Sequence, residues 1–160
     1  MSTAAPDTRE LIEIKVHGVV RDENTETQIV ILRDEQGADV LPIWVGLAEG
    51  NAIRLAQEGI VTPRPMTHDL IRSVTAHLNI QVQRVVITDV KKTTYYATVY
   101  LSSKGVDRTL DARPSDAIAL ALRAHCPIYV TQDVLNRRSS ANADAWLEKL
   151  LTKKADNQEV

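Results

Sequence analysis

Hydrophobic and polar residues alternate at the start of the chain. Ile12, Ile14 and Val16 are separated by polar residues, and a period of two is typical of a strand with one buried face. Two further runs rich in β-branched residues follow, and turn-forming residues lie between them at 34–37. The first three predicted strands are residues 11–20, 28–33 and 40–45.

The pattern then changes to helical spacing. Residues 47–58 carry small and aliphatic side chains near helical spacing, and Gly59 is suited to end this helix. Residues 67–78 predict an amphipathic helix with one hydrophobic stripe. The stripe consists of Leu70, Ile71, Val74 and Leu78. The remaining predicted elements are strands at 80–90, 94–101, 107–110 and 128–130, and helices at 115–124, 131–138 and 143–151.

The order of these elements indicates the fold class. Three strands, two helices, three more strands and a helix do not alternate as βαβ units do, which argues against a Rossmann-like sheet. We predict an α+β fold with mixed or antiparallel sheets and packed helices. Residues 52–56 match residues 117–121 at four of five positions, each after three strands. This predicts a β3α internal duplication, although short Ala/Leu helices also produce such matches by composition alone.

The composition is that of one ordinary globular domain. The chain has 160 residues, 44% hydrophobic and 25% charged, which is enough to bury a core. No run of about 18 apolar residues is present, so we expect no membrane span. The net charge of −2 argues against a protein that coats nucleic acid by bulk electrostatics. Residues 51–125 carry 10 basic and 6 acidic side chains, which fits either a locally basic face or a solvated strand face.

Both ends of the chain differ from its middle. Residues 1–10 are small, polar and acidic and lack the pattern of a signal peptide, which predicts a disordered leader and a cytoplasmic location. Residues 11–138 form the predicted domain, and residues 139–160 a C-terminal helix and polar tail. The apolar first helix and the long strands, whose edges need protection, predict a homodimer.

The first segment with candidate chemistry leads into the helix predicted at 67–78. Two prolines stiffen the approach, Thr67 can cap the helix, and Asp69 can offset the positive end of its dipole. In a functional interpretation, His68 and Asp69 present an imidazole and a carboxylate where backbone N–H groups favour a phosphate. These residues alone favour the capping role.

The second segment opens the helix predicted at 115–124. Asp111, Arg113 and Asp116 are three ionisable side chains within six residues, next to an otherwise apolar helix. Either Arg113 forms a buried ion pair with one aspartate, or the carboxylates face a cleft and bind a divalent cation. One pair of carboxylates is a weaker metal signal than a dense acidic cluster. Glu49, in the first turn of an earlier helix, can join this group only through folding.

Four blocks of the sequence resemble the bifunctional nuclease domain family, in the family's order and spacing. They are Leu41-Pro42-Ile43-Trp44-Val45-Gly46 with Glu49, Pro63-Arg64-Pro65-Met66-Thr67-His68-Asp69-Leu70, Asp111-Ala112-Arg113-Pro114-Ser115-Asp116-Ala117-Ile118-Ala119-Leu120-Ala121, and Pro127-Ile128-Tyr129-Val130. The resemblance covers residues 11–138 and implies a small α+β domain that hydrolyses phosphodiester bonds in DNA and RNA. One local departure is Gly50, which lowers helix propensity by up to about 1 kcal/mol, so we expect the first helix to start later.

The resemblance favours a metal-assisted nuclease. The catalytic residues that it implies are His68, Asp69, Asp111 and Asp116, with His68 as general base or acid. Asp111 and Asp116 would hold Mg²⁺ or Mn²⁺, which activates water and neutralises phosphate. The substrate-binding residues that it implies are Arg64, Thr67, Arg113 and Ser115, with the two arginines holding phosphate oxygens.

Two other hypotheses remain open from the residues. The domain can be a non-enzymatic regulatory or interaction domain, in which Arg113 pairs with Asp69 or Asp111 and locks two helix starts together. It can also be an anion- or nucleotide-binding module that uses the helix N-termini without chemistry.

Overall fold

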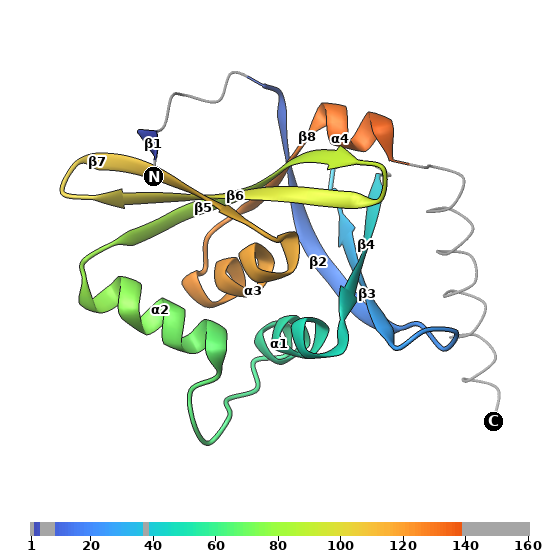
Figure 1. Ribbon diagram of the computed structural model, residues 1–160, viewed down its shortest axis with the longest axis horizontal. Coiled ribbons are helices and arrows are strands. Elements are labelled where there is room, and N and C mark those ends of the chain that lie inside the picture. The colour runs from blue at the N-terminus through green and yellow to red at the C-terminus, as the bar shows by residue number, and fades with distance from the viewer. Residues whose placement is uncertain (1, 4–8, 37–38, 139–160) are drawn as a thin grey trace.

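The computed structural model describes residues 2–3, 9–36 and 39–138, and it has the predicted α+β fold (Figure 1). The strands are β1 (Ser2–Thr3), β2 (Leu11–Arg21), β3 (Thr27–Arg33), β4 (Val40–Gly46), β5 (Gln81–Lys91), β6 (Thr94–Ser103), β7 (Val106–Ala112) and β8 (Ile128–Thr131). The helices are α1 (Leu47–Gln57), α2 (Thr67–His77), α3 (Pro114–Ala124) and α4 (Gln132–Arg137). The C-terminal helix and tail predicted at 139–160 lie outside the described residues.

The eight strands of the described residues form one mixed sheet, in the order β1-β7-β6-β5-β8-β2-β3-β4. Strands β5 and β8 are parallel, and the other neighbouring pairs are antiparallel. β2–β3–β4 form one antiparallel meander, β5–β6–β7 form a second, and β8 lies between them. α1 follows the first meander and α3 follows the second, which is the order that a β3α repeat requires.

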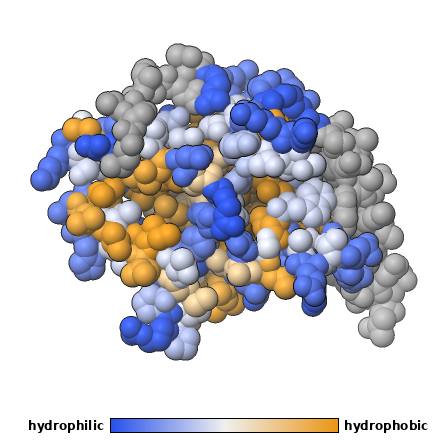
Figure 2. All heavy atoms as spheres, in the orientation of Figure 1, coloured by the Kyte–Doolittle hydropathy of each residue, from blue (hydrophilic) through white to orange (hydrophobic). Residues whose placement is uncertain are grey.

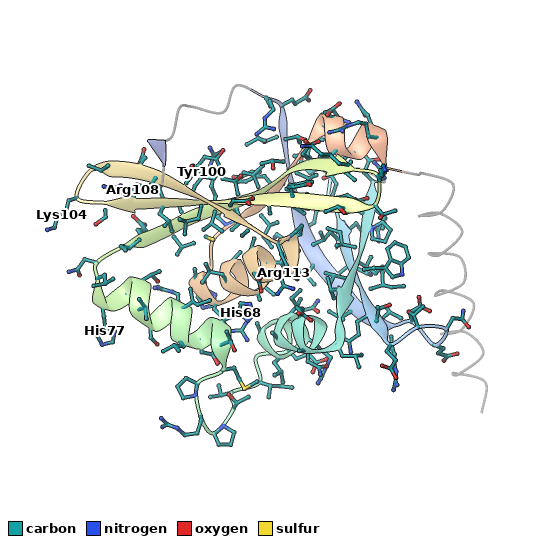
Figure 3. The ribbon with its side chains drawn as sticks, in the orientation of Figure 1. His68, His77, Tyr100, Lys104, Arg108 and Arg113 are labelled. Atoms are coloured by element: carbon teal, nitrogen blue, oxygen red, sulfur yellow. The ribbon has the colours of Figure 1, made fainter. Side chains whose placement is uncertain are left out.

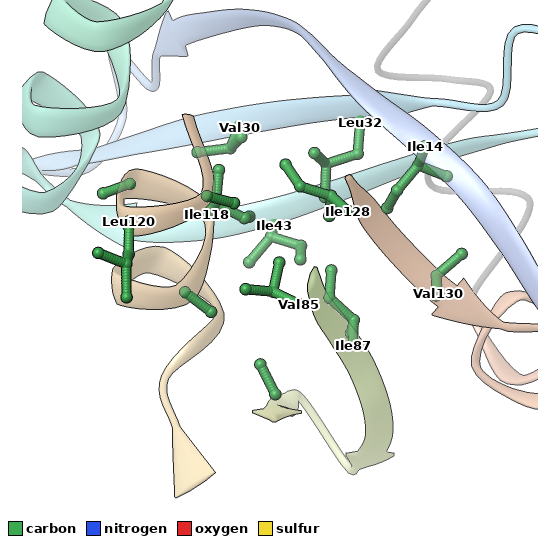
Figure 4. Close-up of a cluster of buried hydrophobic side chains, with 14 of the residues drawn as sticks. Ile14, Val30, Leu32, Ile43, Val85, Ile87, Ile118, Leu120, Ile128 and Val130 are labelled. Carbon is green, nitrogen blue, oxygen red and sulfur yellow. The ribbon is translucent and has the colours of Figure 1, made fainter. Parts of the chain in front are cut away.

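Helices α1, α2 and α3 lie on one side of the sheet and α4 on the other (Figure 1). Helix α3 is apolar almost all round, and residues 117–121 are buried along it, as expected of a helix enclosed by other elements. Ile118 belongs to one hydrophobic cluster with Val30 and Ile43 from the first half and Val85 and Ile87 from the second (Figure 4). The two halves therefore share one core. No helix in the described part of the chain is long and apolar enough to cross a membrane.

Ser2–Thr3, within the leader predicted at residues 1–10, pair with β7, because the edge of that strand offers unpaired backbone groups. Residues 1 and 4–8 of that leader lie outside the described residues. The prediction of a later start for the first helix is wrong. Helix α1 begins at Leu47 and includes Gly50, which is buried. A Cβ at Gly50 would lie 2.9 Å from the Cβ of Gln28 on β3. The helix approaches the sheet closely at this position, and tertiary packing outweighs the low helix propensity of glycine.

Candidate active site

Three helices bring their first turns together on one side of the sheet. Both α1 and α2 pack against α3, and His68 and Arg113 lie between these helices (Figure 3). Arg113 is the N-cap of α3 in an extended conformation, and Pro114 occupies the first helical position, where its fixed φ and missing N–H are tolerated. The sequence thus directs the Arg113 side chain away from the helix axis and toward its neighbours.

Asp116 is at the centre of the cluster. Its Oδ1 lies 2.9 Å from Nε2 of His68, and its Oδ2 accepts a hydrogen bond of 2.8 Å from Nε of Arg113. Nη2 of Arg113 donates to Oδ1 over 3.3 Å, so the guanidinium binds the carboxylate with two donors. Burial raises the pKa of Asp116, but the hydrogen bonds from Arg113 and His68 outweigh it and lower the pKa. Asp116 is therefore a carboxylate near neutral pH.

Arg113 joins a second carboxylate to this group. Its Nη1 donates to Oε1 of Glu49, in the first turn of α1, over 3.2 Å. Its side chain is nevertheless 64% exposed, whereas His68 is buried. The site therefore has a buried imidazole held by a carboxylate, next to a guanidinium that solvent can reach.

Asp69, beside His68 in sequence, belongs to a different contact. Its Oδ1 accepts a hydrogen bond of 2.7 Å from Nε of Arg123, and its Oδ2 accepts one of 2.8 Å from the N–H of Met66. The predicted cap at Thr67 is wrong, because Met66 is the N-cap and Asp69 satisfies its backbone donor. The other donors of Arg123 bind carbonyl oxygens of Ala119 and Ala52. This arginine therefore ties α1, α2 and α3 together.

Asp111 does not join the cluster. It lies on β7 opposite Thr98 of β6, and its neighbour Ala112 packs against the core. Successive side chains of a strand point to opposite faces, so Asp111 is directed to the face of the sheet away from Asp116. Of the predicted substrate-binding residues besides Arg113, Arg64 and Thr67 are exposed and Ser115 is buried at the start of α3.

Comparison with known proteins identifies the family. A family model for the bifunctional nuclease domain matches residues 30–143. An uncharacterized protein of Mycobacterium tuberculosis is 41% identical over 125 residues, which cover 77% of this chain and 73% of that protein. The chain belongs to the bifunctional nuclease domain family. Bifunctional nuclease 1 of Oryza sativa subsp. japonica is 33% identical over 117 residues, 71% of this chain and 34% of that protein. Bifunctional nuclease 2 of Arabidopsis thaliana is 30% identical over 108 residues, which cover 64% of this chain and 32% of that protein.

Two residues of this bifunctional nuclease domain make contacts at the site that the sequence does not predict. The sequence predicts Glu49 only as a residue that can join the cluster through folding. Its contact partner Arg113 is 64 positions away in the chain, and only the fold brings the two together. No role is assigned to Arg123 from the sequence. It follows Asp116 by seven positions, and residues seven apart share one face of a helix. That spacing on an otherwise apolar helix is a signal that can identify Arg123 as a partner for α2.

The predicted cation ligands, Asp111 and Asp116, lie on different elements, β7 and α3. Among the described residues, no three His, Cys, Asp or Glu side chains are placed to hold a metal ion together. Both carboxylate oxygens of Asp116 already accept hydrogen bonds from Arg113 or His68, and a cation would have to displace the guanidinium. The donor set at Asp116 therefore does not fit Mg²⁺ or Mn²⁺ as it stands.

Proposed function

We propose that this domain hydrolyses phosphodiester bonds in DNA and RNA at the cluster of His68, Asp116 and Arg113. The observation that carries the proposal is the 2.9 Å contact between His68 and Asp116, beside the exposed guanidinium of Arg113. Membership of the bifunctional nuclease domain family supports it, as do the names of the plant relatives.

The chemistry needs a group that moves a proton and a group that binds charge. Asp116 holds Nε2 of His68, which leaves Nδ1 as the atom for proton transfer. Nδ1 takes a proton from water while the water oxygen bonds to phosphorus. The bond from phosphorus to the leaving oxygen breaks, and its electron pair stays on that oxygen. The leaving oxygen takes a proton from solvent, and the imidazolium returns its proton to solvent. Imidazole is suited to this role because it changes charge near neutral pH. The Asp116 carboxylate stabilises the imidazolium that forms.

Arg113 would bind the phosphate. A guanidinium matches phosphate oxygens with two parallel donors and stays charged at any relevant pH. Its hydrogen bonds to Asp116, and to a lesser degree to Glu49, raise its pKa further. Because most of its side chain is in solvent, it can reach the substrate while Glu49 and Asp116 hold its position. It would stabilise the negative charge that develops on the phosphate oxygens.

The test is cleavage of plasmid DNA and of a fluorescent single-stranded RNA by purified variants. We expect His68→Ala and Asp116→Asn each to lower the rate by about 100-fold or more. We expect about the same loss for Arg113→Ala. Arg54→Ala is the matched control, because the Arg54 side chain is 41% exposed and also pairs with a carboxylate, that of Glu58 at the C-cap of α1. Unchanged cleavage by folded His68→Ala would refute the proposal, since residual activity would then come from elsewhere.

Dependence on Mg²⁺ or Mn²⁺ is a separate proposal that rests on the sequence resemblance. It requires that the cation displace Arg113 from Asp116, and in that case EDTA abolishes cleavage and added Mg²⁺ or Mn²⁺ restores it. Full activity in EDTA would contradict metal dependence and would leave the roles of His68 and Arg113 intact. A cytoplasmic location also remains a prediction from the sequence.

The second candidate function is a regulatory or interaction domain without catalysis. It is favoured by the mutual pairing of Glu49, Arg113, Asp116 and His68, which can serve to lock three helix starts together. The sequence hypothesis paired Arg113 with Asp69 or Asp111; those pairings are wrong, since Arg113 binds Asp116 and Glu49. If all three site variants are inactive only because they unfold, the structural function gains support.

A further inference from the structure

Helix α2 is amphipathic, but its hydrophobic stripe faces solvent. Met66, Leu70, Ile71, Val74 and Leu78 form this stripe, and each is 40% to 62% exposed. His68 is the only buried residue of the helix. The helix is thus held to α3 largely by the polar contacts of His68 and Asp69. Its hydrophobic face has no partner among the described residues.

The stripe is a concentrated patch. Five of the twelve large exposed hydrophobic residues in the described parts of the chain belong to it. Figure 2 shows hydrophobic side chains gathered over α2 and continuing toward the strands of the second meander. On that side, Val106 and Leu110 of β7 are also exposed. Contiguous apolar surface of this kind on a folded domain marks an interaction site.

We propose that the α2 stripe is the interface at which two copies of this chain form a two-fold homodimer. Four of its residues, Met66, Leu70, Val74 and Leu78, follow one another at intervals of four and form a single ridge. Ridges of this i, i+4 type from two helices interdigitate in the commonest class of helix packing. The interface of a two-fold dimer uses the same surface on both subunits, so one such ridge packs against its own copy.

The distribution of charge on α2 also favours a second copy of the chain as the partner of the stripe. Asp69 and Arg72 of α2 are directed toward α3 and not out over Leu70, Val74 and Leu78: Asp69 binds Arg123, and Arg72 lines a pocket together with Leu122 and Arg123. Two stripes can therefore meet without opposing like charges. Binding of single-stranded nucleic acid uses aromatic side chains and several cations, and membrane-surface helices carry a face rich in Lys and Arg. The stripe is aliphatic and lacks both features.

The size of the surface is compatible with a stable dimer. A standard interface buries about 800 Å² on each partner, with a hydrophobic centre and a polar rim. An 11-residue helix is only about 16 Å long, so the stripe supplies the centre. Exposed hydrophobic residues outside the stripe, such as Ile60, Val61, Val106 and Leu110, can supply the remaining area. The predicted contribution of α1 to the dimer is not needed, because α1 buries Ala52 and Ile53 in the core of its own chain.

The test is sedimentation velocity and light scattering over a range of protein concentrations. We expect the wild-type protein at twice the chain mass of 17.8 kDa. Leu70→Asp and Val74→Asp should raise the dissociation constant by about 30-fold or more, the effect of losing a central interface residue. Tyr96→Asp is the matched control, since Tyr96 is an exposed hydrophobic residue on β6, away from α2, and it should leave the dimer intact.

A second experiment does not depend on disrupting the surface. In a Cys126→Ser background, Val74→Cys should oxidise to a covalent dimer in high yield, because the middle of the stripe meets its copy at the two-fold axis. A monomeric wild-type protein at all concentrations would overturn the proposal, as would a dimer that both aspartate variants retain. Vesicle or oligonucleotide binding that Leu70→Asp abolishes in a monomeric protein would assign the stripe to a membrane or to nucleic acid instead.

Discussion

Two arginines near α3 have opposite environments and different expected roles. The side chain of Arg123 is 10% exposed and binds Asp69 and two backbone carbonyls. The side chain of Arg113 is 64% exposed although it contacts two carboxylates. A partly buried, fully hydrogen-bonded pair is costly to break, whereas an exposed pair contributes little. The geometry therefore assigns stability to Arg123 and leaves Arg113 available for a ligand.

This difference predicts distinct effects of two similar substitutions. Arg123→Ala should lower the free energy of unfolding by about 3 kcal/mol, because it removes the guanidinium from Oδ1 of Asp69 and one hydrogen bond from each of two carbonyl oxygens. The corresponding fall in Tm is about 5–10 °C for a domain of this size. Arg113→Ala should cost at most about 1 kcal/mol. Circular dichroism melts of both variants measure the effect, and equal shifts would contradict the assignment.

Asp69 makes the domain less stable as the pH falls into the acid range. The hydrogen bond from the N–H of Met66, and then the contact with Arg123, hold its pKa below the ordinary value of 3.8. A carboxylate with a lowered pKa in the folded state stabilises the fold fully above its unfolded pKa, and the effect is lost as the pH falls through the folded pKa.

We therefore expect Asp69→Asn to be less stable than wild type at neutral pH and to lose less stability on acidification from roughly pH 5 to pH 2. Thermal melts across this interval measure the difference. Asp133→Asn is the control, because Asp133 pairs with Arg137 at an exposed position of α4 and should change the acid dependence little. Parallel Tm profiles for wild type and Asp69→Asn would argue against a lowered pKa.

The sequence predicts the residues at the ends of helices and strands better than it predicts the contacts between those elements. It identified His68, Arg113 and Asp116, because ionisable residues at the start of an apolar helix are conspicuous. It did not separate Asp111 from these residues, because the strand predicted at 107–110 runs to Ala112 and the alternation of a strand then directs Asp111 to the other face. Hydrophobic periodicity likewise predicted the stripe of α2, but it cannot tell which surface covers a stripe.

Gly50 offers a test of how packing overrides local propensity in α1. Replacing glycine by alanine in an exposed helix is stabilising by about 1 kcal/mol. Here a new Cβ would lie 2.9 Å from the Cβ of Gln28 and closer still to its amide oxygen, and overpacking of this kind costs about 1–3 kcal/mol. Gly50→Ala should therefore destabilise the domain in urea unfolding.

The compensating change makes this prediction specific. Gln28→Gly removes the Cβ, the amide carbon and the amide oxygen that obstruct the new Cβ, so the Gly50→Ala/Gln28→Gly double variant should be more stable than the sum of the two single changes predicts. The double-mutant cycle isolates the contact between α1 and β3. A stabilising effect of Gly50→Ala alone would show that Gln28 moves aside without cost.

The two β3α halves are joined by a strand that belongs to neither meander. β8 follows α3 in the chain but lies between β5 and β2, parallel to the first and antiparallel to the second. The two halves are therefore connected in two ways: through β8 in the sheet, and through the shared core around Ile118. The sequence predicted the repeated order of strands and helices. It did not predict the insertion of β8, because four residues of strand carry no signal of which neighbours they pair with.

A core shared in this way predicts that the halves unfold together. Ile118 is fully buried in the second half, and Ile118→Ala should lower the free energy of unfolding by about 2–5 kcal/mol. In a Trp146→Phe background, Trp44 of β4 is the remaining tryptophan, so its fluorescence reports on the first half. If the domain is one cooperative unit, Ile118→Ala shifts the fluorescence transition and the far-ultraviolet circular dichroism transition in urea to the same lower midpoint. Val61→Ala, at an exposed position, should shift neither. A fluorescence midpoint that stays in place while the circular dichroism midpoint falls would mean that the halves unfold independently and that β8 does not couple them.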